Sequence, residues 1–307
     1  MDILLNIRNR IYFGLVSVVA RIFSIVHFLL RKSAFLRACY YKALPRQIVA
    51  ATHGEMTFVV NSGDQVIAQE IFVHGSFDLR KAQRAFELAK FDSGKSIFVD
   101  VGTNIGSICL PILKHKLAES AVAIEPDALN FSLLRANSIL NGLSDRVTCH
   151  NMAVGAREDE ILTFELSDEN YGDHRISLGQ GAGQFNEQNR KTIQVKSTKL
   201  DVVLNDIIDR SLFIWMDTQG FEGYILSGAE IVLARAFPMV LEFWPYGMER
   251  AKSYDLLKSA VLGAPYRVFF DLGEANPVGQ PLTAEALDRL YTALAARETF
   301  TDILLTR

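Results

Sequence analysis

From residue 96 onward, short apolar runs alternate with segments of helical spacing, and this alternation constrains the fold more than any other feature. The predicted strands are SIFVDVG, AVAIEP, RVTCHNMAV, LFIWMD, PMVLEFW, YRVFFDL and FTDILLTR. The segments of helical spacing between them are 105–117, 127–140, 223–235, 253–262 and 284–296. Because continuous apolar strands alternate with helices, we expect an α/β fold with a mostly parallel seven-stranded sheet covered on both faces.

The rest of the chain predicts two further parts. EILTFEL and KTIQVKSTKL are strand-like and flank the polar segment 168–190, whose length is typical of a lid or substrate loop. Upstream, MTFVV and QVIAQEIFV predict two strands around an Asn-Ser-Gly-Asp turn, and 78–91 predicts a helix. We therefore divide the chain into an N-terminal helical extension (1–44), a small β/helix lead-in (45–95) and a main domain (96–307).

The N-terminal extension is basic and apolar. It carries seven basic residues and one acid, a net charge of +6, whereas the remainder carries 25 basic and 34 acidic residues, a net charge of −9. Its apolar stretch, residues 11–30, is long enough to span a bilayer, but Arg21 at its middle costs about 2.5–3.5 kcal/mol on insertion. Three alternatives stay open: an interfacial helix on an anionic membrane, a helix packed on the protein or on a partner subunit of a homo-oligomer, and a true span.

The composition of the chain indicates its cellular compartment and the kinds of partner that it binds. Cys39, Cys109 and Cys149 form no CxxC pair and no even-numbered framework, which indicates free thiols in a reducing, cytoplasmic compartment, at the inner face of the membrane if the extension binds there. The histidines lack metal-ligand spacing, so we predict no metal site. The acidic main domain disfavours nucleic acid as a partner.

The stretch FVDVGTNIG, residues 98–106, predicts a binding turn after a buried strand. Ligands of open α/β sheets bind beyond the carboxyl ends of the strands, and Gly102 and Gly106 allow a tight turn there. A dinucleotide site would need three glycines as G-x-G-x-x-G, whereas this turn has an acid, Asp100, before the first glycine. A carboxylate repels a pyrophosphate and suits an ammonium group, so we expect a ligand with an amino-acid end.

The next two strands supply the residues that we expect to bind the rest of this ligand. Glu125 ends the second strand, where a carboxylate can accept hydrogen bonds from both hydroxyls of a ribose. The third strand leads to Asn151, Met152 and Ala153, an amide and two apolar side chains that suit an adenine edge. An adenosine that carries an amino acid is S-adenosyl-L-methionine (SAM), which we predict as the cofactor.

Several sequence blocks together resemble the FkbM family of SAM-dependent methyltransferases: FVDVGTNIG, AIEPDALNFSLLRANSILNGL, NMAVGARED, MDTQGFEGYILSGAE and VLEFW. The resemblance covers about residues 70–307 and implies a Rossmann-like class I methyltransferase fold. It also implies O-methylation of a sugar, glycan or lipid-linked saccharide. The cofactor residues that it implies are, for the methionine end, Asp100, Gly102, Asn104 and Gly106, for the ribose Glu125, and for the adenine Ala153 with its neighbours, Asn151 among them.

The chain departs from the family pattern at two positions. The strand before DTQG usually carries a lysine two residues before the aspartate, and this position is Trp215; a glutamate usual near IFVHGSFD is replaced by Asp78. Trp215 leaves open an alternative function, a non-catalytic SAM-fold binding or assembly protein. A nicotinamide oxidoreductase is disfavoured by the missing middle glycine.

Four residues are candidates for accepting the proton of a hydroxyl acceptor. Asp217 ends the fourth strand next to the expected methyl position, and Glu222 follows one turn later. His174 lies on the long polar loop, and Glu242 ends the fifth strand. Each has a structural alternative: Asp217 as a helix cap or ammonium ligand, Glu222 as an ordinary acid of a first helical turn.

Overall fold

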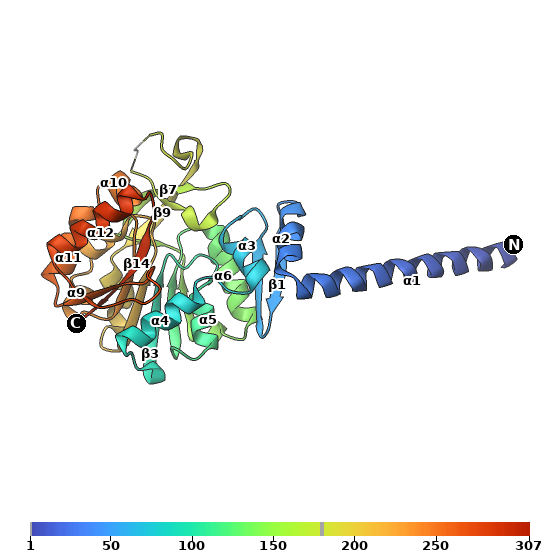
Figure 1. Cartoon of the computed structure of the whole chain (residues 1–307), viewed down its shortest axis with the longest axis horizontal. Helices are drawn as coiled ribbons and strands as arrows, with labels where there is room; N and C mark the ends of the chain where they lie inside the picture. Colours follow the sequence, from blue (N-terminus) through green and yellow to red (C-terminus); the bar gives the residue numbers. More distant parts are fainter. Residues whose placement is uncertain (1, 179–180) are drawn as a thin grey trace.

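An eight-stranded sheet forms the centre of the molecule, a computed structural model that describes residues 2–178 and 181–307 (Figure 1). The strand order is β13-β12-β14-β11-β10-β3-β4-β5. The bounds are β3 (Ser96–Val101), β4 (Ser120–Ile124), β5 (Val147–His150), β10 (Ser211–Met216), β11 (Met239–Phe243), β12 (Val268–Asp271), β13 (Gln280–Pro281) and β14 (Thr301–Thr306). The five strands from β11 to β5 are parallel, and β14 is antiparallel to both of its neighbours. The predicted seven strands are confirmed, and the two-residue β13 is added at one edge.

Helices cover both faces of this sheet over two apolar cores. The first core contains side chains of α7 (Leu200–Leu204), α8 (Glu222–Ser227), α9 (Glu230–Arg235), α10 (Pro245–Ala251), α11 (Tyr254–Gly263) and α12 (Ala284–Ala296). The second contains side chains of α2 (Ala34–Ala43), α3 (Ile67–His74), α4 (Leu79–Ala89), α5 (Cys109–Lys114) and α6 (Ala128–Leu140). Along β10, Ile214 and Met216 belong to the first core and Phe213 and Trp215 to the second, as the two-residue period of a strand requires.

A second sheet packs beside the main one and carries the polar loop. Its order is β6-β9-β7-β8, with β6 (Ala153–Val154), β7 (Glu160–Leu166), β8 (Arg175–Ile176) and β9 (Lys191–Thr198). The predicted loop 168–190 contains β8 and a short 3₁₀ turn, Tyr171–Asp173, and its residues 179–180 lie outside the described part of the chain.

The prediction of a strand for QVIAQEIFV was wrong, because this segment forms helix α3. The Asp64 carboxylate accepts hydrogen bonds from the main-chain N–H groups of Val66 (2.9 Å) and Ala68 (3.0 Å) and so satisfies donors of the first helical turn. Ile67 and Ile71 lie on the buried helical face. The hairpin instead joins β1 (Ile48–His53) to β2 (Met56–Asn61).

Two predicted helices are shorter than expected. The helix predicted for 105–117 begins only at Cys109, because residues 102–106 form a turn with positive φ at Gly102, Asn104 and Gly106. The helix predicted for 223–235 is interrupted at Gly228, where a Cβ would lie 2.7 Å from the carbonyl oxygen of Gly155. A main chain that approaches this closely leaves no room for a side chain.

The N-terminal extension forms α1 (Asp2–Lys32) and α2. Figure 1 shows α1 projecting away from the rest of the molecule, whereas α2 packs on α3. Arg37 fixes the junction, because its guanidinium donates to the carbonyls of Leu30 (2.8 Å) and Val73 (2.7 Å). Among the described helices, we find none with the length and apolar character needed to cross a bilayer.

Candidate functional site

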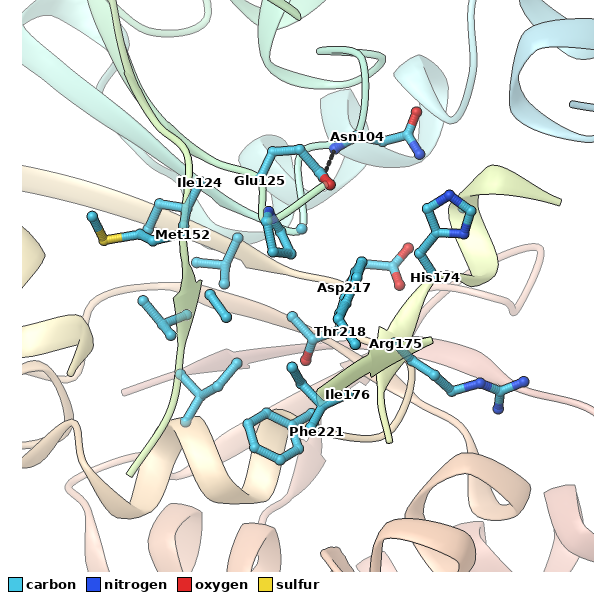
Figure 2. A pocket seen from close by; sticks show the side chains of 18 of the residues that line it. Asn104, Ile124, Glu125, Met152, His174, Arg175, Ile176, Asp217, Thr218 and Phe221 are labelled. Carbon is cyan, nitrogen blue, oxygen red and sulfur yellow. Dashed lines mark hydrogen bonds between the residues drawn. The ribbon is translucent and has the colours of Figure 1, made fainter. Parts of the chain in front are cut away.

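A cavity of about 520 Å³, which we call cavity I, opens where β3, β4 and β10 end (Figure 2). Its polar lining side chains are Asn104, Glu125, Tyr171, His174, Arg175, Asp217 and Thr218. Its apolar lining side chains include Ile124, Met152, Ala153, Val154, Phe164, Ile176, Phe221 and Ile225. In Figure 2, Glu125 and Phe221 lie at opposite sides of the view, with Asp217 and Thr218 between them. The cavity is at the edge of the sheet that the sequence predicted.

The glycine turn after β3 forms one wall of cavity I. Gly102 has φ +83°, and a Cβ there would overlap the main-chain carbonyl oxygen of Asp217. Gly106 has φ +84°, and a Cβ would lie 2.8 Å from Leu110 and 2.9 Å from Leu134. The main chain at Gly102 therefore packs directly on the Asp217 carbonyl, an approach that only glycine permits, and Gly102 also lines the cavity.

Glu125 joins the turn to the end of β4. Its carboxylate accepts main-chain hydrogen bonds from Asn104 (2.9 Å, dashed in Figure 2) and Asp127 (2.8 Å). The side chain is 4% exposed, and this burial raises the pKa of Glu125 to about 8. A buried carboxylate with a raised pKa at a cavity wall is typical of binding and catalytic sites.

Asp100 lies behind the turn and is not among the residues that line cavity I. Its carboxylate accepts hydrogen bonds from the Thr103 hydroxyl (2.7 Å) and the Cys109 main-chain N–H (3.2 Å). Burial raises the pKa of Asp100 to about 6. In this geometry Asp100 holds the turn to the start of α5, and direct contact with a methionine ammonium stays a prediction.

The apolar wall lies opposite the turn. Met152 and Ala153 line the cavity as the sequence predicted, but the Asn151 side chain does not. Its amide donates to the main-chain carbonyls of Glu125 (2.9 Å) and Pro126 (3.1 Å). Asn151 therefore fixes the spacing between the two strand ends on which Glu125 and Met152 lie.

A second cavity, which we call cavity II, lies on the other side of Asp217. Its empty volume is about 1010 Å³, and Asp217 and Gly172 line both cavities. The aromatic residues that line cavity II are Phe77, Phe185, Trp215, Trp244 and Phe300. Its acidic residues are Asp78, Asp173, Asp217, Glu242, Glu298 and Asp302. Asp217 is thus part of the wall that the two cavities share.

Gln219 joins the two carboxylates that sequence analysis placed at this edge. Its amide donates to Asp217 Oδ1 (2.7 Å) and to both carboxylate oxygens of Glu242 (3.1 and 3.2 Å). The pKa of Asp217 is raised to about 8, mainly by burial and secondly by repulsion from the Asp302 carboxylate. Burial and the neighbouring Asp217 raise the pKa of Glu242 well above its ordinary value. The raised pKa of Asp217 is close to the value that suits general base catalysis near neutral pH.

Glu222 is inside the protein and lines neither cavity. It is fully buried, and its Oε1 accepts hydrogen bonds from the main-chain N–H (2.7 Å) and the hydroxyl (2.8 Å) of Thr218. Burial raises the pKa of Glu222 to about 7. In this position Glu222 shapes the turn after β10, and a catalytic role for it stays untested.

His174 lines cavity I rather than cavity II. Its Nδ1 accepts a hydrogen bond from the Ser167 main-chain N–H (3.0 Å), so Nε2 carries the hydrogen. The ring stacks on Tyr171 at 5.3 Å between centroids, and burial lowers the pKa of His174 to about 4. In this tautomer the Nε2–H group is a hydrogen-bond donor, and a role of His174 as base stays a prediction.

Sequence reasoning missed several residues of the site. Tyr171 and Thr218 line cavity I, and Asp302 of β14 lines cavity II. An acid inside the apolar run FTDILLTR was a usable signal for Asp302, because a charged residue in a buried strand is rare unless it is paired. Asp302 is 5% exposed and pairs with Lys81 Nζ at 2.6 Å. No comparable signal marked Tyr171.

In the described part of the chain, no group of three or more His, Cys, Asp and Glu side chains is arranged to hold a metal ion.

Comparison with known proteins gives one family match. Residues 100–258 match the model of the methyltransferase FkbM domain. No curated protein matches the chain. The Rossmann-like class I methyltransferase fold predicted from the sequence is confirmed by the observed sheet together with this match.

Solved structures show distant similarity. A methyltransferase FkbM from Methylobacillus flagellatus KT is 18% identical, with a TM-score of 0.40 over 69% of this chain; the match spans 43% of that protein. TYW2 of M. jannaschii in complex with AdoMet is 10% identical, with a TM-score of 0.40 over 85% of this chain and 86% of that one. A geranyl diphosphate C-methyltransferase from Streptomyces coelicolor A3(2) is 8% identical, with a TM-score of 0.40 over 89% of this chain and 96% of that one.

Proposed function

The chain belongs to the FkbM methyltransferase family and uses SAM as its cofactor, and on this premise we propose that it methylates a hydroxyl group of a sugar, glycan or lipid-linked saccharide. The observation that supports this most is that Asp217 lines both cavities. With the methyl donor in cavity I and the acceptor in cavity II, this carboxylate is next to the point of transfer.

Cavity I fits the chemistry of SAM. Glu125 offers carboxylate oxygens to the ribose hydroxyls, and the apolar wall around Met152 and Ala153 accommodates the adenine. Gly102 and Asp217 line the cavity next to each other, and we assign the methionine end to this part of the wall. The carboxyl groups of Glu125 and Asp217 in the wall can accept hydrogen bonds from hydroxyl and ammonium groups, as the ribose and the methionine end of SAM require.

The residues of the chain supply positioning and proton transfer. When bound, SAM provides a methyl group on a sulfonium centre that is already activated for in-line displacement. Asp217 accepts the proton of the acceptor hydroxyl as the oxygen–carbon bond forms, while Gln219 holds its Oδ1. Glu242, held by the same amide, anchors the acceptor from the neighbouring strand end.

The walls of cavity II favour an uncharged polyhydroxyl acceptor. The exposed rings of Phe185 (46%) and Phe300 (53%) provide flat apolar surfaces, and the carboxylates accept hydrogen bonds from hydroxyl groups. Among the described residues that line cavity II there is no Lys, Arg or His. An anionic reacting end would therefore find no cationic side chain in the wall of cavity II to bind it, and nucleic acid is disfavoured for the same reason.

Isothermal titration with S-adenosylhomocysteine (SAH) and methyl transfer from labelled SAM test the proposal. The acceptor panel contains neutral sugars, uronic acids and extracted surface glycans. We expect label in neutral saccharides, and we expect Asp217→Asn to lower turnover at least about 10²-fold. Asp206→Asn, an exposed carboxylate outside both cavities, is the control. SAH binding without transfer to any acceptor would favour the non-catalytic alternative.

We also propose that α1 binds the surface of an anionic membrane at its cytoplasmic face. Its large apolar side chains from Tyr12 to Leu29 are exposed, and the extension is basic where the rest of the chain is acidic. An exposed apolar helix with basic residues is typical of interfacial binding. We expect the protein to float with anionic liposomes, and Ile22→Asp with Phe23→Asp to abolish flotation. Val278→Asp, at another exposed apolar position, is the control.

A further inference from the structure

Lys81 reaches the carboxylates of cavity II from helix α4, on a different element from the strands that carry the site. Its Nζ lies 2.6 Å from Asp302 Oδ2 and 2.8 Å from Asp78 Oδ2. The Lys81 side chain is 23% exposed and that of Asp302 is 6% exposed. Burial lowers the pKa of Lys81, but the neighbouring Asp302 and Asp78 carboxylates raise it by more. Lys81 therefore stays protonated and positively charged.

Lys81 and Asp217 lie at the two ends of a row of polar side chains on neighbouring strands. Asp302 on β14 is the cross-strand partner of Glu242 on β11. Gln219 then joins Glu242 to Asp217. Three carboxylates are therefore side by side at the ends of adjacent strands, and Lys81 stands at the far end of the row.

Lys81 opposes the repulsion between the acidic side chains around this row. Of the other acids of cavity II, Asp173 is paired with Arg175 and Arg190. Asp217 is further repelled by Glu222 from α8, and Asp302 by Asp271 from β12. Lys81 acts in the opposite direction on both Asp217 and Asp302.

We propose that Lys81 is a positioning residue that governs the protonation of Asp217 through the Asp302–Glu242 row. By holding Asp302 ionised in a fixed place, and by its own charge, Lys81 keeps the proton affinity of Asp217 low enough for it to act as a base near neutral pH. This inference rests on the proposed function, because it gives Asp217 the role of base.

SAH binding tests the inference without knowledge of the acceptor, because Asp217 also lines cavity I. We expect the affinity for SAH to fall as pH is lowered, since protonation of Asp217, and of Glu125 in the same cavity, removes negative charge that attracts the ligand. Only the part of this fall that belongs to Asp217 depends on Lys81. In Lys81→Met, the midpoint of this fall moves upward by about one pH unit, as expected for the loss of one nearby charge. Isothermal titration between pH 5.5 and 9 measures the shift.

Three comparisons separate this role from a merely structural one. Lys81→Arg keeps the cation and restores the midpoint. Lys258→Met removes a lysine of matched exposure (24%) that also joins two aspartates, Asp255 and Asp288, and leaves the midpoint unchanged. In an Asp217→Asn background, Lys81→Met no longer moves the midpoint. Lys81→Gln replaces Lys81→Met if the latter does not fold.

The outcomes are distinct. A midpoint in Lys81→Met that matches the wild type or Lys258→Met, or a shift that persists with Asp217→Asn, overturns the inference and leaves Lys81 as a tie between α4 and β14. Failure of the wild-type protein to bind SAH at any pH overturns the proposed function and this inference with it. A shift confined to Lys81→Met supports both.

Discussion

The main chain at Gly102 passes directly over the carbonyl group of Asp217, so closely that a Cβ on Gly102 would overlap that carbonyl oxygen. The same two strand ends are joined by the hydrogen bond from the Asp217 N–H to the Val101 carbonyl (3.0 Å). The glycine turn and Asp217, the proposed base, are therefore in direct main-chain contact, so a change in the turn displaces Asp217.

Gly102→Ala is expected to lower the free energy of unfolding and to abolish SAH binding. Its φ of +83° alone costs an alanine about 1 kcal/mol, and the overlap with Asp217 adds to this. Gly142→Ala is the matched control, because Gly142 has φ +67° but a Cβ there would meet no atom within 4 Å. Urea unfolding and calorimetry measure both variants. Equal losses in the two would contradict a close approach at Gly102.

Glu125→Gln is expected to weaken SAH binding by about 10- to 100-fold. The amide can accept only one of the two main-chain hydrogen bonds that the carboxylate accepts, from Asn104 and Asp127, and it cannot accept from both ribose hydroxyls. Titration calorimetry measures the loss. The exposed Glu158→Gln should bind as the wild type does, and an unchanged affinity in Glu125→Gln would remove the ribose assignment.

The SAH-free protein is expected to lose stability as pH rises from 5 to 8. Burial raises the pKa of Glu125 to about 8 and of Asp100 to about 6, so the folded state binds more protons than the unfolded state above pH 4. Each such group contributes stability at low pH that is lost, at up to about 1.4 kcal/mol per pH unit, until its folded-state pKa is reached. Urea unfolding at several pH values should show a shallower decline for Glu125→Gln than for the wild type. A stability that rises across this range would refute the buried state of these acids.

Trp215→Phe is expected to lower methyl transfer while leaving SAH affinity within about twofold. Trp215 lines cavity II and not cavity I, and it is 1% exposed beneath the carboxylate row. The smaller ring keeps the packing apolar but leaves a gap on the acceptor side. Binding and turnover, measured on the same preparation, separate the two effects. Parallel losses in both would mean that the cavities are not independent at this wall.

Much of the main domain was predictable because its signals are local. Apolar strands of four to six residues separated by helical segments define the sheet, and the acids at strand ends, Glu125, Asp217 and Glu242, are all at its carboxyl edge. The two-residue period explains why they lie together: Trp215 and Asp217 share a face, as do Val240 and Glu242. Because burial requires apolar side chains at fixed positions along each strand, this alternation can be read from the sequence.

The remainder depended on particular hydrogen bonds and ion pairs that the sequence pattern does not show. Residues 65–73 contain an apolar run too short to distinguish strand from helix, and the cap at Asp64 decided it. The sequence predicts that Asp100 faces the ligand, yet hydrogen bonds from Thr103 and Cys109 direct its carboxylate into the start of α5. The pair of Lys81 and Asp302 joins positions 221 residues apart, which no local pattern encodes.

Because Asp217 is a shared wall, the enzyme cannot adapt its two cavities separately at that position. Any substitution that reshapes the acceptor side there also perturbs the donor side, so new acceptor preferences must arise by change elsewhere. The far wall of cavity II, around Phe77 and Phe300, is free of this constraint. Directed evolution toward other acceptors should therefore accumulate substitutions at that wall and leave the partition intact.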